Sequence, residues 1–416
     1  MKICIICIFY PPYTFGGGTV FVKTLAESMS KRGHDVFIIT TKPYDGSASI
    51  HSSVWTVNGV RVYGFCPTSV QNIPIYSGKV SKYSRIFTFL LNFWNPLSYY
   101  LVRKILKKEK PDLVNIHGAT YLSYSVYSAV RSLNIPYIST LHDVWTFYPL
   151  NNLPYLDKIA GVKYPFLNDN YKVYDIISSI YAKINRIIIG NPNYVTFVSN
   201  AVKNIYLDYG FFNQSKKIVL PNIFEIDETE SKKEKTNKKT FDIIYAGGLE
   251  RKKGGHTLIK AFRKIHDKYI RLHIFGSGEY EVYFKKLAEG DKRIIFYGQM
   301  PNEELQKFYK ISDIAVMPSE YFETFGRIII ESFRVGVPVI GSNVGAIPEL
   351  IKEGYNGFLF EPGNDEQLKN KLEYAILHKE ELKEMSINCI NTAKKYSVEN
   401  NIYKLEEIFK EAIKLK

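Results

Sequence analysis

Short apolar runs alternate with longer amphipathic stretches along most of the chain. The first run, Lys2–Phe9, is followed by a glycine-rich turn and a predicted helix, Thr19–Arg32, which Gly33 ends. Further runs predict strands at Asp35–Thr40, Leu113–Ile116, Tyr137–Thr140, Val195–Val198 and Ile218–Leu220. Strands that alternate with helices in this way are typical of a parallel sheet covered by helices.

The alternation is interrupted once and then resumes. Glu225–Lys239 has one apolar residue in fifteen, which predicts a solvated linker. The strands expected beyond it are Phe241–Tyr245, Arg271–Phe275, Ile294–Tyr297, Ile314–Met317 and Pro338–Gly341. We therefore predict an α/β protein with an N-terminal domain over 1–222, a linker over 223–240, a C-terminal domain over 241–397 and a last helix within 398–416. Both domains are expected to be Rossmann-like and doubly wound, and to face each other across a ligand-binding cleft.

Composition places a constraint on the partners of the first domain. The 416 residues are 45% hydrophobic and 15% aromatic, which excludes general disorder. Lysine and arginine number 55 against 41 acidic residues, a net charge of +14. Residues 1–222 hold 23 basic and 10 acidic side chains, so they carry +13 of this excess. Such a charge favours an anionic partner for the first half: nucleic acid, an acidic membrane surface or an acidic acceptor.

The cysteines do not indicate a metal or redox site. Four cysteines are too few for a disulfide scaffold in a chain of this length. Cys4 and Cys7 form a C-x-x-C, but their odd spacing on a strand places the thiols on opposite faces, which favours core packing. The mostly apolar stretch 86–102 contains Asn92, Asn95 and Pro96, so it does not predict a membrane-spanning helix. We expect a cytoplasmic protein, with contact to the inner face of the membrane as an open possibility.

Two segments carry residues suited to binding a phosphorylated sugar. Gly16-Gly17-Gly18 follows the first strand and precedes a helix, which is compatible with a phosphate-facing turn or with an ordinary tight turn. In Pro318–Gly341, Glu323 precedes a predicted helix and Glu331 lies within it. Carboxylates there can accept hydrogen bonds from sugar hydroxyls and from a ribose diol. The first-turn amides, those of Phe325, Gly326 and Arg327, are expected to be free donors.

Glu323 and Glu331, followed by the sequence GVPVIGSNVGAIPEL, resemble the E-x7-E signature of retaining glycosyltransferases of family 4, which have the GT-B fold. Other segments agree with this family in order and spacing, and together they cover nearly the whole chain. They are Gly16-Gly17, Arg32–Val36, Pro111–Val114, Leu141–Asp143, Val198-Ser199, Leu220–Asn222, Gly247–Gly254, Ile274–Gly278 and Gly354–Leu359.

The resemblance implies a role for each matching residue. Gly16 and Gly17 would face the donor diphosphate, and Lys253 is at the position of a phosphate-binding lysine. Glu323 would contact the hydroxyls of the donor sugar and Glu331 the nucleotide ribose. His142 matches a histidine near the reacting sugar, so His142 and Glu323 are the expected catalytic residues.

One position departs from the family pattern. The family usually has an arginine five residues before the lysine, and this chain has Gly248 there. We expect Arg251 or Arg327 to replace its cationic contact to the diphosphate; Lys252 is a further candidate.

The implied activity is transfer of a hexose-type sugar from a nucleotide-diphosphate sugar to an acceptor hydroxyl, with retention of configuration. No D-x-D and no cluster with metal-ligand spacing occurs, so we expect neither a metal ion nor another cofactor. A sugar-nucleotide epimerase or a glycan phosphorylase of the same fold remains an alternative, as does a non-enzymatic protein that binds anions or nucleic acid. Nucleic-acid binding is not expected, because it would leave Glu323 and Glu331 unexplained.

The segment Lys79–Lys110 bears on the acceptor. It holds eight basic residues and one acid, Glu109, around the aromatic stretch 86–102. This pattern suits either a surface resting on anionic lipid head groups or a buried helix of the first domain. Together with the charge of +13 it favours a peripheral membrane contact and a lipid-linked or polysaccharide acceptor.

Overall fold

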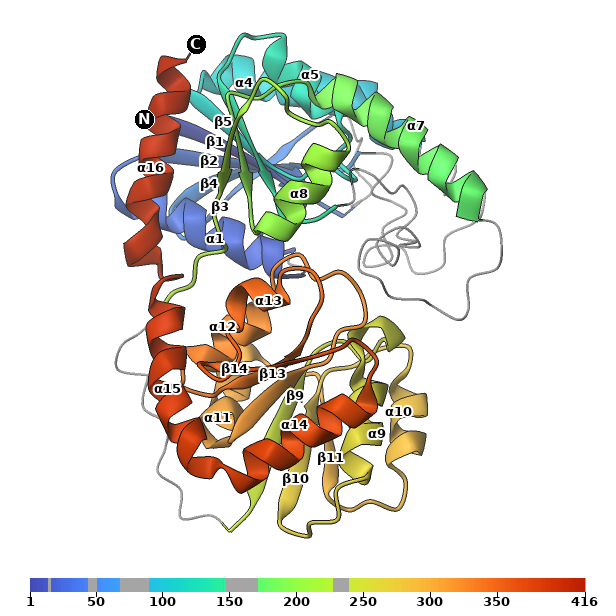
Figure 1. Ribbon diagram of the computed structural model, residues 1–416. Helices are drawn as coiled ribbons and strands as arrows, with labels where there is room; N and C mark the ends of the chain where they lie inside the picture. Colours follow the sequence, from blue (N-terminus) through green and yellow to red (C-terminus); the bar gives the residue numbers. More distant parts are fainter. Residues whose placement is uncertain are drawn as a thin grey trace. The chain divides into compact units, whose positions relative to one another are not determined.

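The computed structural model describes residues 1–13, 16–43, 51–67, 90–144, 146, 171–226 and 239–415 (Figure 1). The chain divides into two compact units. The first unit contains the described residues up to Phe224 together with those from Val398 onward, and the second contains those from Glu225 to Ser397. Residues 79–89 of the basic segment lie outside the described residues.

The first unit is built on a sheet that has eight strands among the described residues, in the order β3-β4-β2-β1-β5-β6-β7-β8. Its strands are β1 Lys2–Cys7, β2 Asp35–Thr41, β3 Ser53–Val57, β4 Val60–Phe65, β5 Leu113–His117, β6 Tyr137–Leu141, β7 Tyr194–Phe197 and β8 Lys216–Val219. All neighbours pair in parallel except β3, which is antiparallel to β4. A parallel arrangement of this kind requires helical crossovers, and these cover both faces.

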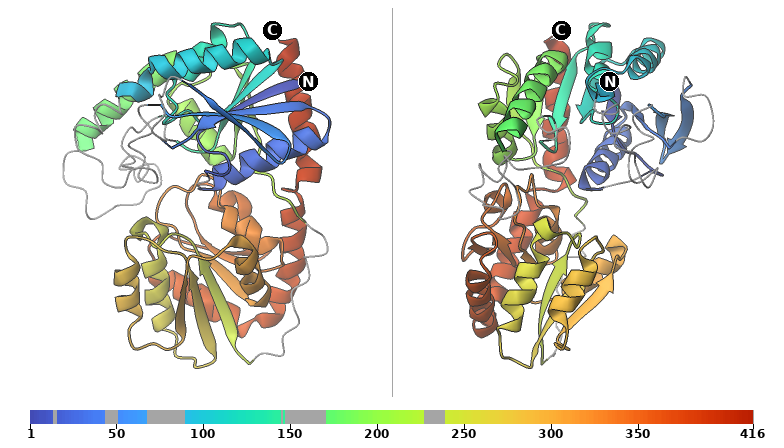
Figure 2. Two further views of the ribbon diagram at one scale, coloured as in Figure 1. Left: turned by 180° about the vertical axis from the view of Figure 1, so that it is seen from behind. Right: turned by 90° about the vertical axis from the view of Figure 1, so that its right-hand side faces the viewer.

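Helices lie on both faces of this first sheet (Figures 1 and 2). They are α1 Gly16–Lys31, α4 Pro96–Glu109, α5 Ser125–Arg131, α7 Tyr171–Ile189, α8 Asn200–Asp208 and α16 Val398–Lys414. One core cluster joins α1 and α16 to the sheet, through residues such as Ile138 of β6. The next residue, Ser139, bonds Tyr127 of α5 at 2.9 Å, so α5 covers the opposite face.

The two N-terminal cysteines follow the same alternation. Cys7 belongs to the core cluster with α1 and α16, whereas Cys4 does not. Both thiols are buried and free. Burial raises the pKa of the Cys7 thiol to about 12, which suits a packing role rather than a reactive one.

The second unit has a parallel sheet of six strands among its described residues, in the order β11-β10-β9-β12-β13-β14. The strands are β9 Phe241–Ala246, β10 Ile270–Phe275, β11 Ile294–Gly298, β12 Ile314–Met317, β13 Val339–Ser342 and β14 Gly357–Phe360. The helices are the 3-10 turn η3 Arg251–Lys253 and α9 Gly255–Arg263, α10 Glu281–Ala288, α11 Asn302–Ile311, α12 Arg327–Phe333, α13 Ile347–Leu350, α14 Asp365–Leu377 and α15 Lys379–Lys394. The prediction of two doubly wound α/β domains is confirmed.

Strands β3, β4 and β14 are absent from the sequence-based prediction. β3 is an edge strand whose side chains are half-buried or exposed, Val54 among them. The run SVWTV is therefore too short and too little buried to stand out by its hydrophobic pattern alone. Its partner β4 is buried, and it follows β3 directly after a turn at Asn58-Gly59.

The last helix, α16, packs against α1 within the first unit, and one carboxylate anchors it. The Nε of Arg32 donates to Glu406 at 2.8 Å, and the Nζ of Lys410 lies 2.6 Å from the same carboxylate. The guanidinium of Arg32 also stacks over the ring of Tyr403 at 4.0 Å, and His34 lies 3.6 Å from Glu406. Hydrogen bonds from Lys410 and Arg32 lower the pKa of Glu406 to about 2.

This pairing predicts a pH-dependent contribution to stability. Because the pKa of Glu406 is lower in the folded state, its stabilisation is complete above its ordinary pKa and is lost as the pH falls to about 2. We expect Glu406→Gln to lower the melting temperature at pH 7 by roughly 2 to 4 °C. The difference from the unmutated protein should narrow below about pH 4 and vanish near pH 2. The exposed Glu407→Gln is the matched control, and an equal effect of both substitutions in thermal scans would contradict the assignment.

Candidate functional site

A buried ion pair joins two of the predicted site residues. The Nζ of Lys253 in η3 donates to Oε1 of Glu323 at 2.8 Å, in the loop that follows β12. Ser319 donates to the same oxygen at 2.7 Å. The hydroxyl of Tyr321 accepts from Lys253 at 2.8 Å and donates to the other carboxylate oxygen at 3.3 Å. Glu323 is only 6% exposed, so its charge depends on these partners.

The pair keeps Lys253 charged. Burial by itself would lower the pKa of this ammonium, but attraction to Glu323 outweighs burial and raises the pKa above its usual range. Burial and the negative charge of Glu323 raise the pKa of Tyr321 to about 12. At neutral pH the site therefore holds a cationic lysine and a neutral tyrosine, both partly buried.

Two close backbone contacts fix the positions of the pair. Gly254, which follows Lys253, has a left-handed φ of 70°, and a Cβ there would lie 1.7 Å from the carbonyl oxygen of Pro318. Only glycine permits this approach, so the lysine loop lies directly on the end of β12. The backbone carbonyl of Glu323 accepts from the amide of Ala346 at 2.8 Å, which ties the glutamate loop to the segment after β13.

The second glutamate lies on α12, as predicted. Gly326 caps this seven-residue helix with a φ of 96°. Glu331 is 9% exposed, and Arg327 one turn earlier donates to it at 3.1 Å. Phe325 is buried, and its ring meets Tyr396 edge-on. The structure therefore brings together Lys253 with Glu323 and, separately, Arg327 with Glu331.

The departure at Gly248 has a structural counterpart. The carbonyl oxygen of Gly248 accepts a hydrogen bond from the hydroxyl of Tyr245 at 3.0 Å. Because residue 248 is glycine, the loop has no side chain at this point. Arg251 begins η3 two residues before Lys253, close enough to Glu320 to influence its pKa. Because Arg251 belongs to the same turn as Lys253, it is the stronger candidate for the cation that Gly248 does not supply.

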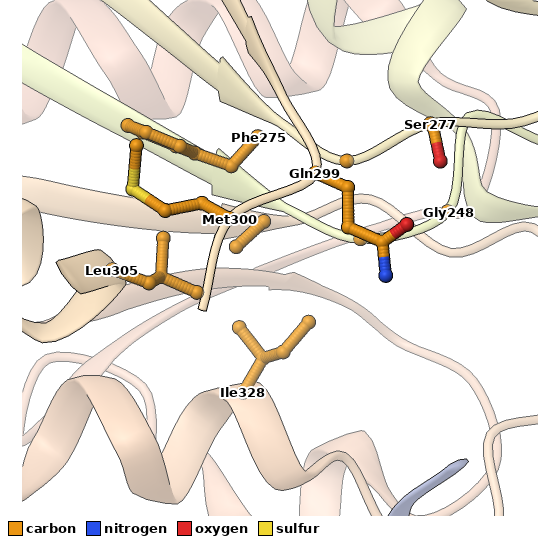
Figure 3. Close-up of a pocket in the computed structure, with 10 residues that line it drawn as sticks. Gly248, Phe275, Ser277, Gln299, Met300, Leu305 and Ile328 are labelled. Carbon is orange, nitrogen blue, oxygen red and sulfur yellow. The ribbon is translucent and has the colours of Figure 1, made fainter. Parts of the chain in front are cut away.

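A pocket of about 320 Å³ opens at the carboxyl ends of β9, β10 and β11 (Figure 3). Figure 3 shows the carboxamide of Gln299 and the hydroxyl of Ser277 beside the loop at Gly248, with the rings and aliphatic groups of other residues around them. The full lining is Ala246, Gly247, Gly248, Phe275, Gly276, Ser277, Gln299, Met300, Leu305 and Ile328. Glycine backbone on one side and apolar side chains on the other suit a flat, polar-edged ring.

The predicted residues of the first unit form a separate group. Gly16 begins α1 with a left-handed φ of 73°, a conformation that favours glycine, and Gly17 follows it in the helix. The Nε2 of His142 lies 2.9 Å from Nδ1 of His117, and the ring of Phe21 is 4.9 Å from that of His142. Burial lowers the pKa of His142 to about 4, so its ring is neutral at pH 7.

Within the residues that the structure describes, His, Cys, Asp and Glu side chains do not gather in groups of three or more that could hold a metal ion. In the same residues, no helix has the length and apolar character required to cross a membrane.

Some contributors to the site were not predicted. The hydrogen bonds of Ser319 and Tyr321 to Glu323 could not be predicted from the sequence, since these contacts depend on how the loop folds. Gln299 and Met300 directly follow a predicted strand. In a doubly wound sheet, residues at that position line the ligand edge, so this rule alone would have nominated them.

Comparison with known proteins identifies the family. Residues 15–228, more than half of the chain, match the family described as Glycosyltransferase Family 4, and residues 226–396 match Glycosyl transferases group 1. The chain belongs to this glycosyltransferase family. The resemblance inferred from the motifs is thereby confirmed, and the protein is a transferase.

Individual relatives are distant but cover most of this glycosyltransferase. An uncharacterized glycosyltransferase of Methanocaldococcus jannaschii is 26% identical over 376 residues, which are 88% of this chain and 87% of the relative. Sucrose-phosphate synthase of Thermosynechococcus elongatus shares the fold with a TM-score of 0.72 and 17% identity, over 100% of both chains. HepE of Anabaena in complex with UDP has a TM-score of 0.71 and 18% identity, over 99% of this chain and 100% of its own.

The cationic loop predicts a graded loss of nucleotide affinity. We expect Lys253→Ala to weaken binding of nucleoside diphosphates by about ten- to 150-fold, the usual effect of losing a charge-assisted contact. Lys253→Ala/Arg251→Ala should bind at least about tenfold more weakly still. Calorimetric titration measures both. Lys292→Ala is the matched control, because Lys292 is an exposed lysine of the same unit outside this loop. A double variant no weaker than Lys253→Ala would contradict compensation by Arg251.

Proposed function

We propose that this glycosyltransferase transfers a hexose-type sugar from a nucleoside-diphosphate sugar to an acceptor hydroxyl, with retention of configuration and without a metal ion. The observation that carries the proposal is the buried contact of Lys253 with Glu323 beside a glycine-lined pocket in the second unit. The HepE complex with UDP, on a similar fold, supports a nucleotide as the occupant of this unit.

The pocket takes the nucleoside in this proposal. Its apolar side chains would pack on the base, and Gln299 and Ser277 would bond the polar edge. Ile328 lines the pocket, and Glu331 follows three residues later on the same face of α12. The carboxylate of Glu331, oriented by Arg327, is thus well located to accept bonds from the two ribose hydroxyls.

In this proposal the diphosphate would bind Lys253, and the sugar would bind Glu323. As the bond between the anomeric carbon and the diphosphate breaks, negative charge collects on the departing phosphate oxygens. Lys253, with Arg251 beside it, would stabilise that charge electrostatically and so supply the role that a metal ion has in other sites. Glu323 would turn to the sugar hydroxyls. The acceptor oxygen attacks the anomeric carbon from the face that the diphosphate leaves, and the acceptor proton passes to the departing phosphate.

The first unit contributes His142, Gly16 and Gly17 in this proposal. A neutral imidazole can donate one hydrogen bond to a sugar hydroxyl without competing for the positive charge that the phosphates require. The amides at the start of α1 would bind a phosphate oxygen.

For the acceptor we propose a lipid-linked or cell-surface glycan. Support comes from the charge of residues 1–222, where 23 basic residues outnumber 10 acidic ones. An acceptor that carries phosphate, at an anionic membrane surface, would be attracted to this unit.

The proposal is tested with a panel of nucleotide sugars. Release of the nucleoside diphosphate on transfer to an acceptor glycan identifies the donor, and the anomeric coupling of the product in NMR reports retention. Activity should persist in excess EDTA. A product of inverted configuration would overturn the stereochemical part, and loss of activity in EDTA would overturn the metal-free part. Epimerised donor with no transfer would indicate an epimerase instead.

The two glutamates should separate kinetically. We expect Glu323→Gln to lower kcat by at least about tenfold, because the neutral amide cannot accept strongly from the sugar in the transition state. Glu331→Gln should chiefly raise the donor KM, by about ten- to 150-fold. Steady-state kinetics with the best donor of the panel measures both. Glu349→Gln, an exposed glutamate of the same unit, is the control, and full activity of Glu323→Gln would remove the basis of the assignment.

A further inference from the structure

Helix α7 exposes a stripe of isoleucines. Ile180, Ile184 and Ile187 are 55%, 37% and 67% exposed, whereas Tyr181, Ala182 and Ile189 of the same helix are buried. At about 100° per residue, the three isoleucines span only about 60° of the helix circumference. The helix therefore has two apolar sides: one packs into the first unit, and the other forms an isoleucine ridge facing outward.

Further apolar side chains adjoin this ridge. Leu90, Trp94 and Tyr100, before and within α4, are each about half exposed. Phe93, next to Trp94, packs on Tyr181 of α7 with ring centroids 4.8 Å apart, so the start of α4 and the middle of α7 are neighbours. Helix α5 contacts both α4 and α7. We call the six exposed residues, Leu90, Trp94, Tyr100, Ile180, Ile184 and Ile187, the α4–α7 face.

Basic side chains border this face, and the charged side chains exposed over 90–110 and 179–189 are all basic. Lys183 is exposed beside the isoleucine ridge, and Lys104, Lys107, Lys108 and Lys110 are exposed at the end of α4. Over 90–110 and 179–189 the one acid is Glu109, which is buried and bound to Lys2 at 2.8 Å. The negative charge of Glu109 is thus neutralised inside the unit, and the nearest exposed acid beyond α4 is Asp112, which accepts from the amide of Lys2 at 2.7 Å.

We propose that the α4–α7 face docks on the surface of an anionic lipid bilayer. The proposal rests on the proposed transfer to a membrane-associated acceptor and adds the surface that binds the membrane. The observation that favours lipid over a protein partner is the combination of an isoleucine ridge, a half-exposed tryptophan and lysines that are the exposed charges of both segments, 90–110 and 179–189. This combination matches the surface of a bilayer. Apolar side chains can enter the acyl-chain boundary, aromatic rings sit at the head-group level, and lysines attract the anionic lipid head groups.

The orientation follows from the geometry of α7. The helix would lie parallel to the membrane, with Ile180, Ile184 and Ile187 entering the boundary between head groups and acyl chains. Trp94 would sit at the head-group level, where its ring is apolar and its N–H can reach water. The long side chains of Lys104 and Lys107 can extend to lipid phosphates from beside the contact. Because each lysine contributes modestly, binding should be reversible and sensitive to salt.

Vesicle sedimentation with the full chain tests the proposal. We expect binding to vesicles of phosphatidylglycerol and phosphatidylcholine, much weaker binding to phosphatidylcholine alone, and a decrease with added salt. Ile184→Glu/Ile187→Glu should reduce partitioning by about tenfold or more, because it places charge in the apolar boundary. Lys104→Glu/Lys107→Glu should reduce it by a similar factor, and only on the anionic vesicles.

Matched controls separate this surface from general effects of charge. Ile387→Glu replaces an isoleucine that is 64% exposed on α15 of the second unit. Lys292→Glu/Lys307→Glu reverses two exposed lysines of the same unit. Both controls should bind vesicles as the unmutated protein does, and melting temperatures report folding of every variant.

Release of nucleoside diphosphate without vesicles is measured in parallel, and it should be equal in all these variants. Equal binding to neutral and anionic vesicles, or no effect of the isoleucine and lysine substitutions, would overturn the docking surface while the transferase activity stands. Light scattering that shows a dimer abolished by Ile184→Glu/Ile187→Glu would overturn it in favour of a second copy of the chain. Loss of activity in the unmutated protein would instead overturn the proposed function.

Discussion

The ammonium of Lys253 and the carboxylate of Glu323 are both largely withdrawn from water, and each is stable there because the other is 2.8 Å away. An isolated buried charge would cost several kcal/mol, so neither group tolerates the loss of its partner. The surrounding residues hold the two side chains in position for this contact. Gly254 lets the lysine loop rest on the end of β12, Ala346 holds the glutamate loop, and Tyr321 bonds both side chains.

The same contact has a functional implication under the proposed mechanism. Lys253 and Glu323 satisfy each other, so an incoming diphosphate must compete with Glu323 for the ammonium. When the phosphate succeeds, the carboxylate loses its cation and gains capacity to accept from sugar hydroxyls. Binding of the diphosphate to Lys253 thereby prepares Glu323 for the sugar, because the two parts of the donor bind the two members of one ion pair.

The sequence predicted what depends on local pattern and left out what depends on tertiary packing. Lys2–Cys7 and the short helix after Gly326 were predictable, because continuous apolar residues and bounding glycines act within a few positions. The family motif located Lys253, Glu323 and Glu331. Tyr321 was not predicted as a bridge, since its role arises only when residues far apart in sequence meet. The edge strand Ser53–Val57 was missed because its side chains are only half-buried or exposed, so its hydrophobic pattern does not stand out in the sequence.

Helix α16 has a consequence for how the protein is made. Its residues Ile402, Leu405 and Phe409 belong to the same core cluster as Ile3 and Ile5 of β1. On the ribosome, the first unit therefore cannot complete its core until the residues of α16 have been synthesised. The second unit, whose residues form one continuous stretch in the described chain, has all its strands available earlier. The half of the protein that is synthesised first is thus the half that must wait, exposing apolar surface that chaperones can recognise during synthesis.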